Sequence, residues 1–226
     1  MTFDLKWPAR SDATLHLPAA GEVHLWRTDL DAGAEDFPGA LSSAEQARAR
    51  QFKAVEHRRR YVHARTWLRQ ILGRYLRITP GEVALEIDGN GKPFIGEATN
   101  SAKLHFNLSH SANFGLLAVM TGHKVGVDVQ IESAKNDWPS IAARYFTVRE
   151  LEHVRALPEK SQPAACVEIW TRKEAAGKAL GIGLHSKTFS FSVGPAAWGK
   201  VRCDENLCVR SLPVEAPFAA AVACVQ

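Results

Sequence analysis

The sequence predicts an α+β fold made of two halves of similar size. Strand-like residues followed by helical residues occur once in the first half of the chain and again in the second, with a linker-like stretch between them at residues 96–103. The 226 residues have an ordinary globular composition, with 46% hydrophobic and 23% charged residues. We expect the halves to span residues 1–103 and 104–226.

The first half begins with a strand over residues 21–31, where apolar and polar residues alternate. A helix follows, which Ser42 or Ser43 can cap through its hydroxyl group. A second helix over about residues 56–76 carries its apolar side chains at helical spacing. Asp88-Gly-Asn-Gly91 then marks a turn between two short strand-like runs.

The second half opens with segments in which apolar residues alternate as in strands: 104–110, 115–120 and 125–131. We expect the second and third of these segments to form a hairpin around residues 121–124. Helices and loops follow from Pro139 to Pro163. One well-formed helix is then expected over residues 164–180, ending at Gly181.

Several classes of protein are excluded by composition. The sequence starts without the long apolar stretch of a secretory signal, and no apolar run approaches the roughly 20 residues of a membrane span. A cytoplasmic location is therefore expected. In that compartment the cysteines are expected to be free buried thiols, since none shows metal-binding CxxC spacing. They are Cys166, Cys203, Cys208 and Cys224.

Positive charge is concentrated in one segment of the chain. The formal net charge is only +4, but residues 48–77 contain ten Lys and Arg residues against the single acid Glu56. A basic face of this kind suits an anionic partner, which could be a phosphate-bearing ligand, an acidic protein or a nucleic acid. The alternative is an ordinary solvated helix face.

The strand-like segment from Val125 to Glu132 separates two kinds of side chain. Its valines share one face with Ile131, while Gly126, Asp128 and Gln130 share the other. A buried carboxylate on such a strand must be paired, hydrogen-bonded or bound to a cation, because burying an isolated charge is costly. The alternative is an exposed sheet face on which Asp128 simply meets water.

In the helix expected over residues 164–180, Trp170, Glu174 and Lys178 follow one stripe. One interpretation is an ordinary surface ion pair between Glu174 and Lys178. The other is that burial of Trp170 carries Glu174 to the edge of the core, where it can meet Asp128. Oxygens from a strand and a helix, completed by waters and substrate phosphates, are a usual environment for Mg²⁺.

These two segments resemble the signature pair of the Sfp-type 4'-phosphopantetheinyl transferases. The pair is Gly126-Val-Asp-Val129 and Trp170-Thr-Arg-Lys-Glu-Ala-Ala-Gly-Lys-Ala-Leu-Gly181. Further segments match the family in the same order along residues 21–193: Leu41–Phe52, Gly91-Lys-Pro93 and Phe106-Asn-Leu-Ser-His110. Five ordered motifs are far harder to obtain by chance than any one of them.

The resemblance implies a pseudo-twofold arrangement of two α+β halves, with coenzyme A bound in the cleft between them. It implies that Mg²⁺, or Mn²⁺ in its place, binds Asp128, Glu174 and the residue at position 130. Here Gln130 stands where that subgroup has a second acidic strand ligand, so it contacts the metal directly, through water or not at all. The residues expected to hold the nucleotide and phosphates of coenzyme A are Arg48, Arg60, Lys92, Ser109, His110 and Lys178.

The resemblance also implies the reaction. A serine of an acidic apo carrier protein, of fatty-acid, polyketide or nonribosomal-peptide type, attacks the β-phosphate of coenzyme A and displaces adenosine 3',5'-bisphosphate. The expected catalytic residues are Asp128, Glu174 and Lys178: Mg²⁺ and Lys178 neutralise charge, and Glu174 is the base. Two equivalent halves in one chain would make a monomer sufficient.

Two other functions compete with this interpretation. A nucleic-acid-binding module could use residues 48–77, and it would bind any polynucleotide in a strongly salt-dependent manner. That segment lacks a known reader motif and the interleaved aromatic residues of a stacking platform, so no nucleic-acid partner is expected, and no membrane partner either. A metal-dependent phosphodiesterase would also use Asp, Glu and Lys.

Overall fold

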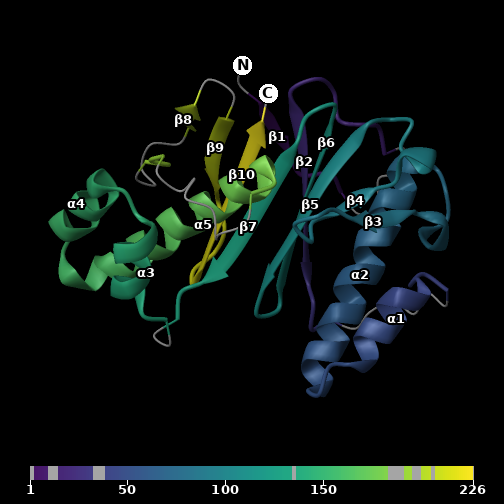
Figure 1. Cartoon of the computed structure of the whole chain (residues 1–226), viewed down its shortest axis with the longest axis horizontal. Coiled ribbons are helices and arrows are strands. Elements are labelled where there is room, and N and C mark those ends of the chain that lie inside the picture. Colours follow the sequence, from purple (N-terminus) through teal and green to yellow (C-terminus); the bar gives the residue numbers. More distant parts are fainter. Residues whose placement is uncertain are drawn as a thin grey trace.

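The computed structural model describes residues 3–9, 15–32, 39–133, 136–182, 191–194, 200–204 and 207–225. Within these residues the strands form two four-stranded sheets and one small hairpin, which lie side by side with their helices (Figure 1). The halves are therefore both α+β. No helix in the described part of the chain is long and apolar enough to cross a membrane.

The first sheet has the strand order β1-β2-β6-β5 and carries two helices. Its strands are β1 (Asp4–Lys6), β2 (Glu22–Asp29), β6 (Phe114–Thr121) and β5 (Leu104–Ser111). The helices are α1 (Ser43–Arg50) and α2 (Val55–Leu76). Leu68 and Leu72 of α2 are fully buried in one core with Leu117 and Val119 of β6. The hairpin of β3 (Leu85–Ile87) and β4 (Pro93–Ile95) follows α2.

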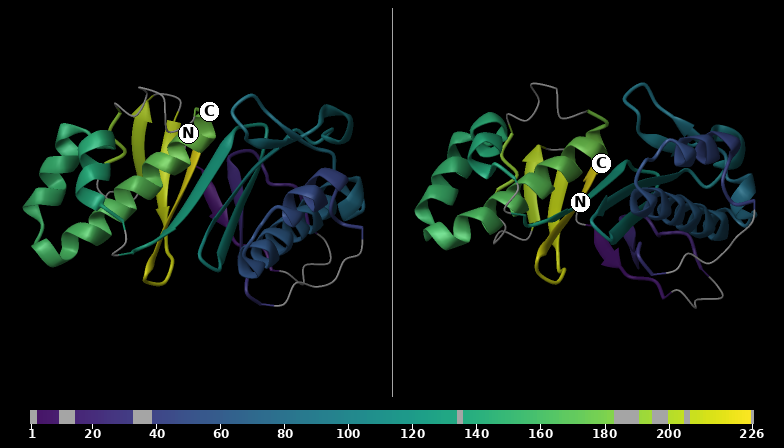
Figure 2. Two further views of the ribbon diagram at one scale, coloured as in Figure 1. Left: turned by 60° about the horizontal axis from the view of Figure 1, so that its bottom comes forward. Right: turned by 90° about the horizontal axis from the view of Figure 1, so that it is seen from below.

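The second sheet has the order β7-β10-β9-β8 and is covered by α5 (Gln162–Leu180). Its strands are β7 (Val125–Ile131), β10 (Phe218–Val225), β9 (Leu207–Leu212) and β8 (Lys200–Asp204). Helices α3 (Trp138–Tyr145) and α4 (Val148–Ala156) precede α5 and pack against it. The two views of Figure 2 show α5 lying across the strands of this sheet, while α1 and α2 lie beside the first sheet.

A shared apolar core joins the two sheets. Val125, Val127 and Val129 of β7 are fully buried in one cluster with Val23 and Leu25 of β2. This confirms the apolar face that alternation predicted for the strand. The other face of β7 packs against α5, so β7 lies between the first half of the chain and α5.

Most of the expected elements are present, but one expectation is wrong. The segments 114–121 and 125–131 do not form a hairpin, because β6 pairs with β2 and β5 whereas β7 pairs with β10. Residues 122–124 instead cross from one sheet to the other. The division of the chain expected between residues 103 and 104 stays a prediction; β5 and β6, which follow it, belong to the first sheet. The sheets divide at this crossing.

The two halves repeat one arrangement of cap and ion pair. In each half a short helix starts with a capping box, Ser-x-x-Glu in α1 and Thr-x-x-Glu in α4. The same glutamate also pairs with a basic residue of the long helix. Glu45 Oε2 lies 2.7 Å from Nε of Arg69 in α2, and Glu150 Oε2 lies 2.9 Å from Nζ of Lys173 in α5.

The ends of the long helices extend this match. Both α2 and α5 end at a residue with left-handed backbone, whose N–H group bonds a glycine carbonyl four residues back. Counting back from these ends, Gln70 and Arg74 of α2 correspond to Glu174 and Lys178 of α5. The repeat is thus one of geometry, with different chemistry at matching positions.

Candidate active site at the boundary between the sheets

The site is built on the open edge of β7. This strand bonds β10 along one edge, and its other edge faces β5 without a shared backbone ladder. N–H groups of β7 donate instead to side chains of β5: Val127 to Asn107 Oδ1 (2.8 Å), Val129 to Ser109 Oγ (3.4 Å) and Ile131 to Ser111 Oγ (3.0 Å). The segment Asn107-Leu-Ser-His-Ser111 therefore covers a strand edge whose polar groups would otherwise be unpaired.

Two lysines complete this edge by donating to its carbonyl oxygens. Lys178 Nζ lies 3.3 Å from the carbonyl of Val127, and Lys92 Nζ lies 3.1 Å from that of Val125. Lys178 comes from α5, whereas Lys92 follows the turn of the β3–β4 hairpin. Groups from both halves therefore meet along one strand.

Asp128 is the centre of the polar cluster. It is only 1% exposed, so the alternative of a solvent-exposed sheet face is excluded. Its Oδ1 accepts hydrogen bonds from Ser109 Oγ (2.7 Å) and from Lys178 Nζ (2.6 Å). Its Oδ2 accepts one from Gln130 Nε2 (3.0 Å). The buried charge is thus paired and hydrogen-bonded, which offsets the cost of burial.

Glu174 faces this cluster from α5. Its pKa is raised to about 7, chiefly by burial and also by the negative charge of Asp128, while Lys178 acts in the opposite direction. The described part of the chain provides no hydrogen bond or ion pair to its carboxyl group. Glu174 therefore has oxygen atoms free to take a proton or a cation.

The carboxylates of the site suit a divalent cation whose remaining positions are filled by phosphates of a bound substrate. Among the described residues no group of three or more His, Cys, Asp and Glu side chains could hold a metal ion. The site offers two carboxylates, Asp128 and Glu174, whose repulsion a cation would relieve. One or two carboxylates completed by substrate phosphates is the usual mode of Mg²⁺ binding. The nearby Gln130 directs its amide nitrogen at Asp128.

Cations from both halves surround His110 at the end of β5. Burial lowers the pKa of His110, and the charges of Lys178 and Arg60 lower it further. Arg60 comes from the first turns of α2 and donates to both carboxylate oxygens of Asp31, at 2.8 and 2.6 Å. It also pairs with Glu56 at 2.7 Å. His110 is only partly covered, however, and keeps an exposed surface that a ligand can reach.

The basic segment 48–77 is divided between inward and outward side chains. Arg65 and Arg69 are committed to Glu45, and Arg74 stacks over the ring of Trp26. The exposed cations are Arg48, Arg50, Lys53, Arg58, Arg59 and Arg77. Arg48 lies over the ring of Phe52 and donates to Gln51 Oε1 at 2.9 Å. The segment is therefore neither a uniform basic face nor a purely solvated one.

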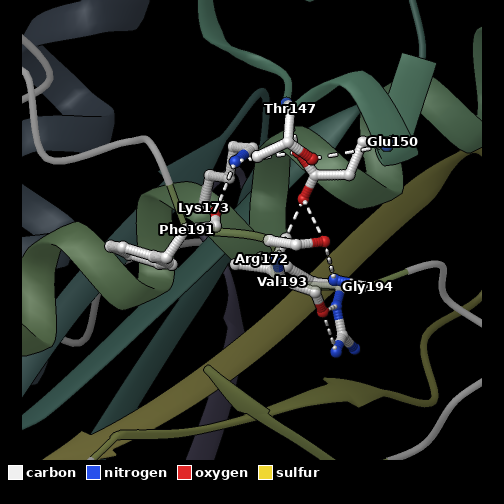
Figure 3. A network of polar contacts seen from close by, with 8 residues as sticks. Thr147, Glu150, Arg172, Lys173, Phe191, Val193 and Gly194 are labelled. Carbon is white, nitrogen blue, oxygen red and sulfur yellow. Dashed lines mark hydrogen bonds and ion pairs between the residues drawn. The ribbon is translucent and has the colours of Figure 1, made fainter. Parts of the chain in front are cut away.

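A second polar network surrounds Lys173, the residue before Glu174 in α5, and the sequence did not predict it (Figure 3). The Lys173 ammonium is fully buried, and it bonds Glu150 Oε2 at 2.9 Å and the carbonyl of Phe191 at 3.0 Å. Glu150 Oε1 accepts from the N–H of Val193 at 2.8 Å. The neighbouring Arg172 donates to the carbonyl of Val193 at 2.7 Å. The pattern Thr147-x-x-Glu150 indicates a capping box in the sequence, but it does not indicate that Glu150 also pairs with Lys173 of α5.

The structure brings most of the predicted site residues together. Ser109, Asp128, Gln130 and Lys178 are directly hydrogen-bonded, and Glu174 and His110 lie within electrostatic reach of them. Lys92 joins the cluster through the backbone of α5, and Arg60 lies close to His110. The contacts described for Arg48 are with its own helix end. The ligand and metal roles of all of them stay predictions.

Three of the cysteines can be compared with expectation. Cys166, Cys208 and Cys224 are free thiols, of which Cys166 and Cys224 are buried and Cys208 is half-buried. This confirms the expectation of free thiols at these positions. The side chain of Cys203 lies outside the described part of the structure.

Comparison with known proteins agrees with the geometry. A model for the N-terminal part of 4'-phosphopantetheinyl transferases matches residues 34–122, and a model for the 4'-phosphopantetheinyl transferase superfamily matches residues 124–223. The two matches meet at the crossing between the sheets.

Curated relatives are similar over most of the chain. The 4'-phosphopantetheinyl transferase HetI of Nostoc sp. is 42% identical over 166 residues, which are 72% of this chain and 70% of that protein. The 4'-phosphopantetheinyl transferase AcpT of Salmonella typhi is 31% identical over 70% of this chain and 80% of its own. The 4'-phosphopantetheinyl transferase Sfp of Bacillus subtilis is 26% identical over 70% of this chain and 68% of its own length. The chain therefore belongs to the 4'-phosphopantetheinyl transferase family.

Proposed function

We propose that this enzyme moves the 4'-phosphopantetheine group of coenzyme A onto a serine hydroxyl of an apo carrier protein in a Mg²⁺-dependent reaction. Family membership establishes phosphopantetheinyl transfer to a carrier protein. The co-substrate, the metal and the product adenosine 3',5'-bisphosphate belong to the proposal. The observation that carries it is the buried pair of Asp128 and Lys178 beside the unpaired carboxyl of Glu174.

Asp128 and Glu174 would hold the Mg²⁺ ion, with Mn²⁺ as an alternative. The raised pKa of Glu174 beside the charge of Asp128 supports this, because a cation would stabilise both carboxylates in their ionised form. When bound, the ion would neutralise charge on the phosphates during transfer. We place Gln130 beside the ion as the group that orients Asp128, since its amide N–H already donates to that carboxylate.

Lys178 and His110 are proposed to contact the phosphates of coenzyme A. The Lys178 side chain is 29% exposed, and a phosphate oxygen could replace the carbonyl of Val127, which at 3.3 Å is the most distant of the three acceptors of its ammonium, while the bond to Asp128 is kept. Arg60 and Arg48 would add positive charge from the first half. The hydroxyl of Ser109 already donates one hydrogen bond and accepts two, which leaves it no capacity for a phosphate. We assign Ser109 to holding Asp128 and Lys178.

Glu174 is proposed as the base that takes the proton of the carrier serine. The serine oxygen bonds to the β-phosphorus, the bond from that phosphorus to the bridging oxygen breaks, and adenosine 3',5'-bisphosphate leaves. Positioning and charge neutralisation dominate phosphoryl transfer, which suits a site that holds its ammonium group by three hydrogen bonds. The exposed cations of residues 48–77 would attract an acidic carrier protein, and one chain with both halves would act as a monomer.

Mass spectrometry tests this proposal. Purified protein is incubated with Mg²⁺, coenzyme A and a panel of apo carrier proteins, and a mass gain of one phosphopantetheine group is scored. Glu174→Gln should lower the rate at least about 1,000-fold, because it removes both base and ligand. Glu168→Gln is the matched control, since it makes the same change at another half-buried position of α5. Absence of transfer by the wild-type protein to every carrier would overturn the proposal.

A further inference from the structure

Lys92 reaches out of its own half and binds the end of α5. Its Nζ atom donates to the carbonyl of Lys178 at 2.6 Å and to the carbonyl of Val125 at 3.1 Å. Both acceptors belong to the second half of the chain, whereas Lys92 lies in the β3–β4 hairpin. The ammonium group is thus engaged by protein carbonyls at the boundary between the halves.

A second residue of the same turn makes a parallel contact. Asn90 Nδ2 donates to the carbonyl of Gly181 at 2.7 Å. The side chain of Asp88 shapes the turn, because its Oδ1 accepts from the backbone N–H groups of Asn90 (2.9 Å) and Lys92 (2.8 Å). We call residues 88–92 the clasp. The side chains of Asn90 and Lys92 donate hydrogen bonds to two carbonyl groups at the C-terminus of α5, which lie three residues apart.

The end of α5 needs such donors. The last carbonyl groups of a helix lack partners within the helix, and they form the negative end of its dipole. Gly181 ends α5 in the left-handed conformation, and the N–H groups of residues 181 and 182 both return to the carbonyl of Gly177. The carbonyls of Lys178 and Gly181 are satisfied by the clasp instead.

The ammonium of Lys92 occupies an unfavourable position for a charge. Its pKa is lowered to about 8, chiefly by burial and also by the nearby charges of Lys124 and Lys178, against the effect of Asp88. A flexible lysine could relieve this by turning into water, yet its Nζ atom stays on two carbonyl groups. The two hydrogen bonds, to α5 and to β7, offset part of the lost hydration.

The residue that Lys92 holds is the one whose side chain completes the site. The backbone carbonyl of Lys178 accepts a hydrogen bond from Lys92. The side-chain Nζ atom of Lys178 donates to Asp128, Ser109 and the carbonyl of Val127. We propose that Lys92, assisted by Asn90, is a positioning residue that fixes the last turn of α5 from the other half of the chain and so sets the place of the Lys178 ammonium. The catalytic part of this inference rests on the proposed function, but the structural part does not.

The first experiment needs no substrate. Lys92→Met keeps the aliphatic stem and removes the donors, while Lys124→Met removes a nearby exposed charge. Amide hydrogen exchange of residues 178–182 should be about tenfold faster in Lys92→Met than in the wild type and unchanged in Lys124→Met. Asn90→Ala alters an exposed side chain and should give a smaller acceleration of the same amides. Unchanged exchange in both clasp variants would overturn the inference.

The second experiment separates positioning from phosphate binding. If Lys92 positions Lys178, Lys92→Met should lower kcat about 10- to 100-fold while KM for coenzyme A changes less than about twofold. A rise of tenfold or more in the Kd for coenzyme A, with normal exchange at the end of α5, would instead make Lys92 a ligand of coenzyme A and refute the inference. If no protein transfers phosphopantetheine, the proposed function fails, and the exchange data still decide the clasp.

Discussion

Gly126 of β7 allows α5 to pack directly on the strand, and replacing it tests how closely the site depends on that packing. A Cβ atom at this position would lie 2.2 Å from the carbonyl oxygen of Ala175, 2.3 Å from the nitrogen of Ala179 and 2.9 Å from the carbonyl carbon of Lys178. All three are backbone atoms, so no side-chain rotation can relieve the overlap. An ordinary contact of 3.4 Å requires α5 to move by about 1 Å.

Gly126→Ala should therefore affect stability and catalysis together. Overpacking of this kind costs about 1–3 kcal/mol in the free energy of unfolding, measured by urea denaturation followed by tryptophan fluorescence. The backbone of Lys178 must move with the helix, and a displacement of about 1 Å at a reacting group lowers kcat by about 100-fold.

Gly89→Ala is the control for the stability measurement alone, because Gly89 belongs to the clasp proposed to position Lys178. A Cβ atom at Gly89 meets nothing within 4 Å, so its free energy of unfolding should change by less than about 0.5 kcal/mol. Wild-type stability and wild-type kcat in Gly126→Ala would refute the close packing of α5 on β7. Loss of stability with an unchanged kcat would show that the position of Lys178 tolerates the shift.

Three further predictions follow from contacts of single side chains. Lys173→Met leaves the charge of Glu150 buried and unpaired, so the free energy of unfolding should fall by about 3–5 kcal/mol in urea denaturation. Ser109→Ala and Ser111→Ala each remove one bond to β7. Only Ser109 also holds the carboxylate of Asp128 and the ammonium of Lys178, for which we propose catalytic roles, so only Ser109→Ala should lower kcat at least about tenfold in the transfer assay. The pKa of Asp31 is lowered from 3.8 to about 2 by two arginines, so it stabilises the fold above pH 3.8 and loses this effect as the pH falls to about 2. Asp31→Asn should make the free energy of unfolding depend less steeply on pH between about 4 and 2, as measured by acid titration of the folded protein. An unchanged midpoint of acid unfolding would contradict the prediction.

Local signals in the sequence were sufficient for the helices. The helix expected over 164–180 spans Gln162–Leu180 and ends at Gly181, and the one expected over 56–76 spans Val55–Leu76. Helical periodicity, caps and the terminal glycine are properties of neighbouring residues, so they are readable without the fold.

Strand pairing was not readable in this way. A short glycine-containing turn at residues 121–124 is compatible both with a hairpin and with a connection between two sheets, so the sequence does not distinguish them. The partner of β7 is β10, whose residues lie about ninety positions further along the chain. The expected hairpin failed because it was inferred from segments that are adjacent in sequence.

The site was partly readable. The carboxylates of Asp128 and Glu174 and the ammonium of Lys178 gather as the strand and helix patterns indicated. The burial of Asp128 could not be inferred from the strand alone, because alternation fits an exposed face equally well. The pairing of Glu150 with Lys173 was missed because a capping glutamate looks complete without a second partner.

The match between the two long helices has a consequence for the number of reaction centres that the proposed function gives to one chain. The second half carries a carboxyl and an ammonium at positions 174 and 178, whereas the first half carries Gln70 and Arg74 there. An amide and a guanidinium that stacks on Trp26 supply neither a base nor an anionic ligand. With the proposed roles of Glu174 and Lys178, the architecture is repeated but the reaction centre is not: α5 would carry the chemistry and α2 would support it, with one centre per chain.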